Sequence, residues 1–198
     1  AGLKISKHLG LGVKTRDGEL LEVDDARLDP IWKKAGQLGI VVGIHTGDPL
    51  AFFEPPGPQN ERHAELSQAP SWSFHGKEFP ARDELLAARD RLIARHPNTT
   101  FMLLHVANNP EDLDYVDRLM REHPNVVIDL AARIGEIGRH DAARVRSFFE
   151  DHADRILFGT DLQLSGKPRG NQLAYRLTLG SISEEPPRLD DIDEFYDR

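Results

Sequence analysis

Four residues that can bind a metal or carry a proton end four apolar runs. The runs and their final residues are 40–45 with His45, 101–105 with His105, 126–129 with Asp129, and 156–161 with Asp161. One such residue alone is most simply a hydrogen-bonded strand end. Four together favour a shared site, because catalytic groups of parallel α/β folds gather at the carboxyl ends of strands.

Helical patterns separate these apolar runs. We expect helices to begin near Pro30, Pro80, Pro110 and His140, with Asp29 and Asn109 as the N-caps before two of the prolines. A further short strand is expected from Leu3 to Lys7, which brings the expected strands to five. The alternation of helices with buried strands predicts an α/β fold with a parallel sheet.

An internal repeat supports this alternation. Residues 90–98 and 117–125 match at six of nine positions, with a period of 27 residues, about one strand–helix unit. The repeat places His96 and His123 at the C-termini of helices, where a histidine interacts favourably with free carbonyls. We therefore expect both histidines to be structural.

The connection after the first histidine is long. Residues 46–79 contain both tryptophans and a Pro-Pro-Gly-Pro stretch. Loops of this length are uncommon in compact domains unless they serve a function or are disordered, and the aromatic content argues against disorder. We predict an active-site loop that covers the strand ends, with Trp72 in contact with substrate.

Composition narrows the class of partner. A net charge of −8 and a pI near 5.6 argue against nucleic-acid binding. No apolar run approaches the ~18 residues of a membrane span. The chain has no Cys, so a metal site must use His and carboxylate ligands. We expect a cytoplasmic protein, although a leader segment would not be visible in a chain that starts at Ala1.

The choice of fold lies between a (β/α)₈ barrel and an open doubly wound sheet. No Gly-rich phosphate-binding loop follows any expected strand, which disfavours a nucleotide-binding domain. Functional groups spread over four successive strands fit a barrel, in which all strand ends converge on one mouth.

The segments Ile-His-Thr-Gly-Asp-Pro (44–49), Phe-Met-Leu-Leu-His (101–105), 123–133 and Arg-Ile-Leu-Phe-Gly-Thr-Asp (155–161) resemble, in this order, segments of the amidohydrolase-related metal-dependent hydrolases. The similarity covers about residues 3–162, and the branch containing aminocarboxymuconate-semialdehyde decarboxylase looks most similar. The resemblance implies a (β/α)₈ TIM-barrel-type fold, of which about strands 4 to 8 are present. It also implies a divalent metal, most simply zinc.

The same resemblance implies roles for three residues. His45 corresponds to a metal ligand on the fifth strand, and His105 to the histidine on the sixth strand that polarises substrate or orients water. Asp161 corresponds to a metal-bound carboxylate and general base on the eighth strand. Thr46, Asp48 and Thr160 either orient these groups or are ordinary turn residues.

The chain departs from the family pattern at one point. The family carries a His-x-His pair of metal ligands on its first strand, and this sequence has none. His8 and a carboxylated Lys4 or Lys7 are weak substitutes. We therefore expect residues 1–198 to be one amidohydrolase-type domain that is truncated at both ends.

The expected function is a metal-dependent hydrolase or decarboxylase of a small, carboxylated or cyclic molecule. Arg62 and Arg133 are candidates to clamp a substrate carboxylate. Asp129 either faces the substrate or hydrogen-bonds to a loop. The alternative function is a non-catalytic remnant or fragment with a binding or structural role, and metal content discriminates the two. Beyond the substrate we expect no nucleic-acid or membrane partner, and self-association is left open.

Overall fold

The computed structural model describes residues 2–76 and 78–161, together with the backbone of four short strands between residues 163 and 178. Five strands form one parallel sheet in the order β1-β2-β3-β4-β5, which is also their order along the chain. They are β1 (Gly2–Ile5), β2 (Val41–Ile44), β3 (Phe101–Leu103), β4 (Val126–Asp129) and β5 (Ile156–Leu157). The predicted α/β fold with a parallel sheet is confirmed.

Helices connect the strands, and two small antiparallel sheets follow them. The α-helical segments are α1 (His8–Leu11), α2 (Asp29–Gln37), α3 (His63–Gln68), α4 (Arg82–Arg95), α5 (Leu104–Ala107), α6 (Leu113–Glu122), α7 (Ile134–Ile137) and α8 (Ala142–Asp151). The 3₁₀ segments are η1 (Ala26–Leu28), η2 (Leu50–Phe52) and η3 (Pro70–Trp72). The last strands are β6 (Gln163–Ser165), β7 (Pro168–Arg169), β8 (Gln172–Leu173) and β9 (Arg176–Thr178), paired β6 with β9 and β7 with β8.

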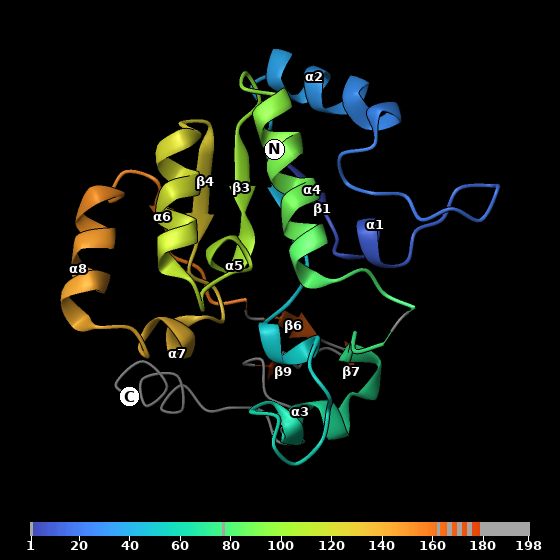
Figure 1. Ribbon diagram of the computed structural model, residues 1–198, viewed down its shortest axis with the longest axis vertical. Coiled ribbons are helices and arrows are strands. Elements are labelled where there is room, and N and C mark those ends of the chain that lie inside the picture. The colour runs from blue at the N-terminus through green and yellow to red at the C-terminus, as the bar shows by residue number, and fades with distance from the viewer. Residues whose placement is uncertain are drawn as a thin grey trace.

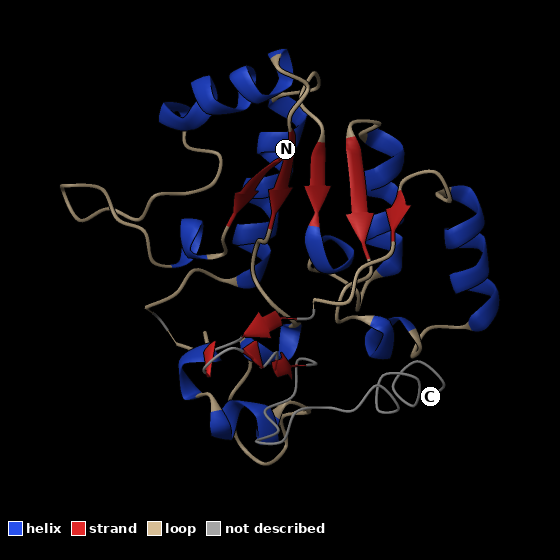
Figure 2. Cartoon of the chain, turned by 180° about the vertical axis from the view of Figure 1, so that it is seen from behind, coloured by secondary structure: helices blue, strands red, loops and turns tan. Residues whose placement is uncertain are grey.

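The longer helices α4 and α6 cover one face of the main sheet, because they lie in front of it in Figure 1 and behind it in Figure 2. The core between these layers is apolar, and Phe101, Leu92 and Val116 are completely buried in it. Helix α2 packs closely at Gly36, where a Cβ atom would lie 2.7 Å from the Asn98 carbonyl oxygen. Among the described residues, no helix combines the length and the apolar character that a membrane span requires.

The two copies of the repeat occupy equivalent places. His96 is the C-cap residue of α4, and His123 is the C-cap residue of α6, as predicted. The Nε2 atom of His96 lies 2.9 Å from Oδ1 of Asp29. Asp29 is therefore not the predicted N-cap of α2, because its carboxylate instead joins the start of α2 to the end of α4.

Helices α4 and α8 begin at Arg82 and Ala142, two residues after the expected Pro80 and His140. The start predicted at Pro110 was wrong. Helix α6 begins at Leu113, and its N-cap is Asp112, whose side chain accepts a hydrogen bond from the backbone of Tyr115. The delay has a local cause: the chain between His105 and Asn108 has positive φ angles, and the following residues must turn it back before a right-handed helix can start.

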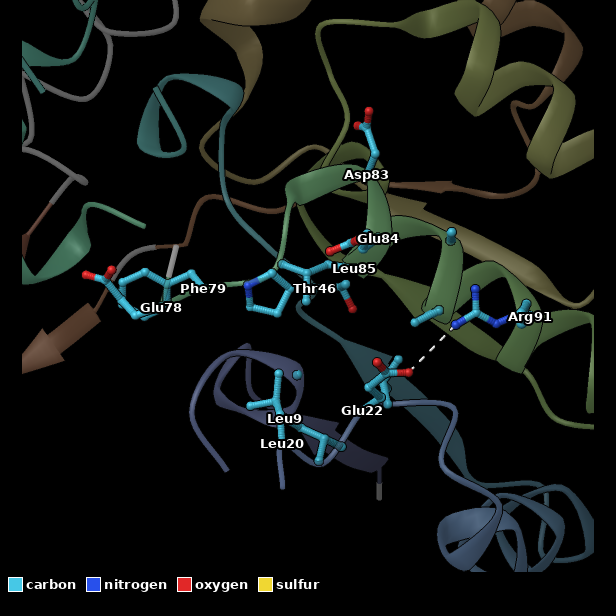
Figure 3. Close-up of a pocket in the computed structure, with 15 residues that line it drawn as sticks. Leu9, Leu20, Glu22, Thr46, Glu78, Phe79, Asp83, Glu84, Leu85 and Arg91 are labelled. Atoms are coloured by element: carbon cyan, nitrogen blue, oxygen red, sulfur yellow. Dashed lines mark ion pairs between the residues drawn. The ribbon is translucent and has the colours of Figure 1, made fainter. Parts of the chain in front are cut away.

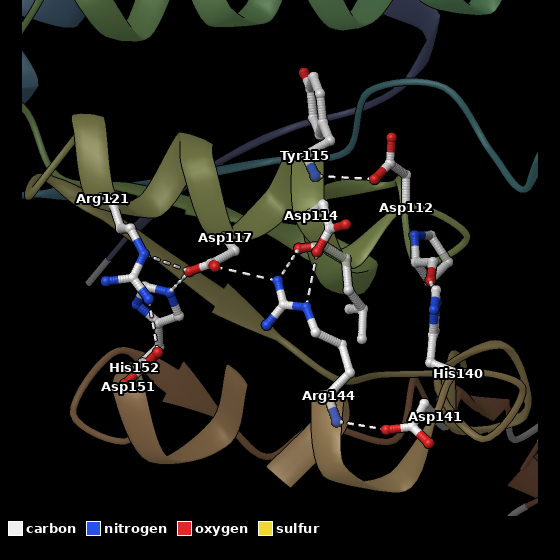
Figure 4. A network of polar contacts seen from close by, with 12 residues as sticks. Asp112, Asp114, Tyr115, Asp117, Arg121, His140, Asp141, Arg144, Asp151 and His152 are labelled. Carbon is white, nitrogen blue, oxygen red and sulfur yellow. Dashed lines mark hydrogen bonds and ion pairs between the residues drawn. The ribbon is translucent and has the colours of Figure 1, made fainter. Parts of the chain in front are cut away.

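Polar contacts join α6 to α8 (Figure 4). The carboxylate of Asp117 lies 2.6 Å from His152 Nε2 and accepts hydrogen bonds from Arg121 at 2.9 Å and Arg144 at 3.1 Å. Burial alone would raise the pKa of Asp117, but the hydrogen bonds from His152 and Arg121 hold it below its usual value. The carboxylate thus stabilises the folded chain while it is ionised.

We predict that Asp117→Asn lowers the free energy of unfolding at pH 7 by about 1–3 kcal/mol, the range for hydrogen bonds to charged groups. A depressed pKa contributes stability that is fully present above the unfolded value near 4 and is lost as the pH falls through the lower folded value, so the difference between the two proteins should shrink progressively below about pH 4. Denaturant unfolding of the whole chain across this range measures the effect. As a control, Asp151→Asn should cost under ~0.5 kcal/mol, because Asp151 is 41% exposed. A constant difference at all pH values would contradict the prediction.

Candidate active site at the carboxyl ends of the strands

The pairing register places the carboxyl ends of three strands at the same edge of the sheet. Ile44 pairs with Leu103, and Leu103 pairs with Ile128, so β2, β3 and β4 end side by side. His45 follows β2 directly, and its backbone N–H donates to Ile5 of β1 at 3.0 Å. Residues that follow these strands are therefore held at one edge of the sheet.

His45, His105 and Asp161, which the sequence analysis placed at the centre of the site, lie together at this edge. The imidazole rings of His45 and His105 meet edge to face, with their centroids 4.6 Å apart. His105 Nε2 lies 4.0 Å from Oδ2 of Asp161. His105 is buried, whereas the Asp161 side chain is 45% exposed. The structure thus brings the three groups within reach of one small molecule, and their individual roles stay predictions.

His105 does not continue strand β3. The segment labelled α5 is a left-handed turn, with φ angles of 57°, 54°, 55° and 52° at residues 105–108. Each non-Gly residue in this region costs roughly 1–2 kcal/mol, and Val106 is a β-branched residue for which it is especially unfavourable. Such strain persists only where surrounding contacts impose it, and it is frequent at functional sites.

Asp129 provides one of these contacts. Its Oδ1 atom accepts the backbone N–H of His105 at 2.8 Å and that of Ala131 at 3.1 Å. Of the two alternatives that the sequence left open for Asp129, the structure shows the hydrogen bond to the loop. The carboxylate therefore supports the turn that carries His105.

The ring of His105 is oriented by the backbone. Its Nδ1 atom lies 2.9 Å from the carbonyl oxygen of Ala131, and since a carbonyl can only accept, Nδ1 carries the proton. Burial lowers the pKa of His105, and the positive charge of Arg133 and the neighbouring His45 lower it further, against smaller opposing effects of Ala131 and Asp161. Nε2 therefore presents a lone pair toward Asp161.

His45 is held through an acidic neighbour. Its Nε2 atom lies 3.3 Å from Oδ1 of Asp48, whose other oxygen pairs with the Lys7 ammonium at 2.5 Å. Burial alone would raise the pKa of Asp48, but His45 and Lys7 lower it below its usual value. The sequence left Asp48 as either a residue that orients the site or an ordinary turn residue, and its contact with the His45 ring fits the first of these. Lys7 serves as an ion-pair partner in this arrangement, and Lys4 is exposed on β1.

The two candidate arginines differ in their partners. Arg62 pairs with Glu136 and with Glu65, the latter at 3.1 Å, so its charge is matched inside the protein. Arg133 is 8% exposed, and its Nη1 donates to the carbonyl of Ala132 at 2.6 Å. Within the described part of the chain, Arg133 Nε has no hydrogen-bond partner. Burial lowers the pKa of Arg133, which nearby Glu136 partly offsets.

The predicted loop of residues 46–79 is ordered by its own aromatic side chains. Phe52 lies 6.2 Å from Trp72, and Phe53 lies 5.4 Å from Phe74, measured between ring centroids. The loop lies beyond the carboxyl ends of the strands in Figure 1 and Figure 2. Trp72 is 37% exposed and its ring lies 6.0 Å from the Lys7 ammonium, so the structure places it near the His45 side of the site.

The number of metal-ligating side chains at the site shows whether the described residues can hold a divalent metal. His45 and Asp161 are the imidazole and carboxylate pair that zinc favours, but a catalytic zinc takes three protein ligands. Residues 2–76 and 78–161 contain no group of three or more metal-ligating side chains. The described His, Asp and Glu side chains therefore do not complete a metal centre by themselves, and His8 does not supply a missing ligand among them.

A cavity of about 760 Å³ lies beside the site, between α4 and the segment before α2 (Figure 3). Thr46 contributes to its lining, but His45, His105 and Asp161 do not. Figure 3 shows carboxylates of Glu22, Asp83 and Glu84 around it, and Arg91 pairs with Glu22 at 3.8 Å. The chemistry-bearing groups thus lie outside this cavity.

Sequence reasoning missed four residues that build the site: Arg82, Arg89, Asn108 and Glu136. The Asn108 side chain accepts the backbone N–H of Thr46 at 2.9 Å and so joins the turn to the end of β2. A signal for Arg82 and Arg89 was present, because both fall at helical spacing on the face of α4 that carries Leu85, Leu92 and Ile93. No comparable pattern marked Asn108 or Glu136.

The fold and site together are those of a parallel α/β protein with polar groups gathered at the strand ends. The chain belongs to the amidohydrolase family, because the model of that family, described as Amidohydrolase, matches residues 1–179. The family prediction from the sequence is thereby confirmed. A search of curated proteins gave no match.

Solved structures with a similar fold include three enzymes. Dihydroorotase from Campylobacter jejuni is 12% identical, with 99% of this chain and 51% of that one covered and a TM-score of 0.47. The 5-carboxyvanillate decarboxylase from Sphingomonas paucimobilis is 17% identical, with 81% of this chain and 47% of that one covered and a TM-score of 0.43. The 2,6-dihydroxybenzoate decarboxylase from Rhizobium is 20% identical, with 75% of this chain and 48% of that one covered and a TM-score of 0.42. This chain therefore spans about half the length of these proteins.

We predict that Lys7→Met loosens the long loop. The Lys7 ammonium lies 5.3 Å from the Phe74 ring centroid and pairs with Asp48, and losing such a cation–π contact costs ~0.5–1 kcal/mol. Hydrogen exchange at the Phe74 amide, which donates to the Phe52 carbonyl at 2.7 Å, should accelerate about 2- to 5-fold. Lys4→Met is the matched control. Unchanged exchange in the Lys7 variant would mean that the Lys7 contacts do not hold the loop.

Proposed function

We propose that this chain carries the active site of an enzyme that hydrolyses or decarboxylates a small carboxylated or cyclic molecule. We further propose that the five-stranded sheet corresponds to about strands 4 to 8 of a (β/α)₈ barrel. Membership of the amidohydrolase family supports the general kind of activity. The observation that carries the substrate class is a pair of buried donors without partners.

These donors are Arg133 Nε and Asn108 Nδ2, and neither has a hydrogen-bond partner among the described residues. Four buried polar atoms of the described residues lack a partner, and these two belong to residues near His105. Nearly all buried polar atoms in proteins are paired, so the two donors favour an acceptor that is not among the described residues. Arg133 lies close enough to His105 to lower its pKa, and Asn108 belongs to the same turn as His105. A substrate carboxylate or carbonyl oxygen is the kind of acceptor that each donor would take.

Arg133 suits a carboxylate better than Arg62 does. The charge of Arg62 is already matched by Glu65 and Glu136, whereas Arg133 has no carboxylate within ion-pair distance in the described ranges. A guanidinium stays protonated in proteins, so burial leaves a positive charge that an anionic ligand stabilises. We assign substrate binding to Arg133 and a supporting role for the loop to Arg62.

His105 is the proposed proton carrier. The hydrogen bond from Nδ1 to Ala131 leaves Nε2 as an acceptor that faces the exposed side of the site, where Asp161 lies. In a hydrolysis, Nε2 accepts a proton from, or orients, the attacking water. His45 and Asp161 are the proposed protein ligands of a divalent metal, most simply zinc, with further ligands from outside the described residues.

Variants of the two arginines test the substrate class. We predict that Arg133→Gln raises KM for a carboxylated substrate about 10- to 100-fold, the equivalent of one or two charged hydrogen bonds. Arg62→Gln leaves buried Glu136 without its partner, so it should lower the melting temperature and change KM by less than ~3-fold. The measurement is steady-state kinetics on a panel of aromatic and aliphatic carboxylic acids, with both CO₂ and hydrolysis products quantified. If both variants change KM equally, Arg133 is not the residue that binds the substrate carboxylate.

Variants of the central residues test the catalytic and metal assignments. We predict that His105→Asn lowers kcat about 10²- to 10⁴-fold and retains metal, as expected for loss of a proton carrier. His45→Ala and Asp161→Asn should lose both metal, measured by elemental analysis, and activity. His8→Asn, in an exposed residue, is the control. If wild-type protein binds no metal and turns over no substrate in the panel, the alternative of a non-catalytic binding role would replace this proposal.

A further inference from the structure

The left-handed turn after β3 leaves its carbonyl groups without partners in the sheet. β3 ends at Leu103, and the φ angles of residues 105–108 are all positive. Within the turn, the backbone N–H of Asn108 donates to the carbonyls of Leu104 and His105, both at 3.0 Å, and that of Asn109 donates to the carbonyl of Val106 at 3.1 Å. The buried carbonyls of Ala107 and Asn108 need donors from other parts of the chain.

Two arginines of α4 supply donors. Nη1 of Arg89 donates to the carbonyl of Ala107, and Nη2 of Arg82 donates to the carbonyl of Asn108 at 2.7 Å. Arg89 is completely buried, and Arg82 is 8% exposed. Charged side chains are almost never buried in this way unless they are paired, so the turn carbonyls and the arginines satisfy each other.

The Arg89 guanidinium is itself fixed. Its Nε and Nη2 atoms donate to Oδ1 of Asp90 at 3.0 and 2.8 Å, and Nη2 also lies 2.8 Å from the Tyr115 hydroxyl. That hydroxyl contacts the other carboxylate oxygen of Asp90. Arg89 is therefore held from the α4 and α6 sides while its remaining donor points at the turn.

Arg82 is fixed in the same manner. Its Nη2 atom also donates to Asn109 Oδ1 and to Glu111 Oε2, both at 2.9 Å, and its Nε reaches the Asp48 carbonyl at 3.3 Å. Asp48 is the residue that pairs with His45. Arg82 therefore contacts the segment that follows β2 as well as the turn after β3.

We propose that Arg89 and Arg82 are positioning residues: they hold residues 105–108 in the left-handed conformation and so set the place of His105 relative to His45. The two arginines lie seven positions apart on α4, two helical turns, and thus act on neighbouring carbonyls of the same turn. The role in catalysis rests on the proposed function, but the effect on the turn does not.

The main test compares Arg89→Met with Arg91→Met, which changes an exposed arginine on the same helix. In the whole protein at fixed pH, NMR should show the His105 Nδ1 proton, protected by its bond to Ala131, in wild type and in Arg91→Met. In Arg89→Met this signal should disappear through faster exchange. kcat should fall about 10²-fold, the effect of a ~1 Å misplacement, with KM changed by less than ~3-fold.

Two further variants keep the proposal falsifiable if Arg89→Met folds poorly. Arg89→Lys retains one donor for the Ala107 carbonyl and should keep the NMR signal and part of kcat. Ala107→Gly removes the steric penalty of the positive φ angle of 55°, so adding it to Arg89→Met should restore the signal. A persistent signal in Arg89→Met, or no rescue by either variant, would overturn the proposal. If wild type shows the signal but no activity, only the proposed function fails.

Discussion

The architecture of the site depends on one unfavourable backbone conformation, the left-handed turn that follows β3. Strand β3 delivers the chain to the edge of the sheet, but a continued strand would alternate side chains between its two faces. The turn instead holds His105 beside His45, with the His105 backbone N–H bonded to Asp129. Its strain is offset by hydrogen bonds from three directions: β4, α4 and the end of β2.

The electrostatics of the site follow from how completely each charge is matched. Arg62 is paired with Glu136, Lys7 with Asp48, and Arg89 with Asp90. Arg133 differs, because burial deprives it of water and no carboxylate pairs with it in the described ranges. An unmatched buried cation beside a neutral imidazole favours anionic molecules, and this asymmetry is the physical basis for expecting a carboxylated substrate.

The long loop is part of this arrangement rather than an appendage to it. Its aromatic side chains pack on each other, and ion pairs join it to Lys7 on one side and to Glu136 on the other. Lys7 follows β1, and Glu136 lies in α7. The loop therefore spans the edge of the sheet at which His45 and His105 lie.

The sequence by itself determined the alternation of strands and helices and the parallel sheet. Apolar runs and helical periodicity depend on neighbours along the chain, so these elements, and the positions of His45, His105 and Asp161 after strands, could be predicted from local pattern, although β5 ends at Leu157, before Asp161. The helix starts after Asp29 and Asn109 could not, because Asp29 is drawn to His96 and Asn109 follows the left-handed turn. These are contacts between distant segments.

The tertiary structure decided which charged residues serve the site. Arg133 and Arg62 look alike in sequence, and only the folded structure shows that Arg62 forms ion pairs with Glu65 and Glu136 while Arg133 Nε lacks a hydrogen-bond partner among the described residues. Arg89 stands at a core position of α4, yet no local rule says that its partner is a carbonyl of the turn after β3. Patterns of hydrophobicity specify which elements form, whereas pairing of buried polar groups depends on distances that exist only after those elements have packed.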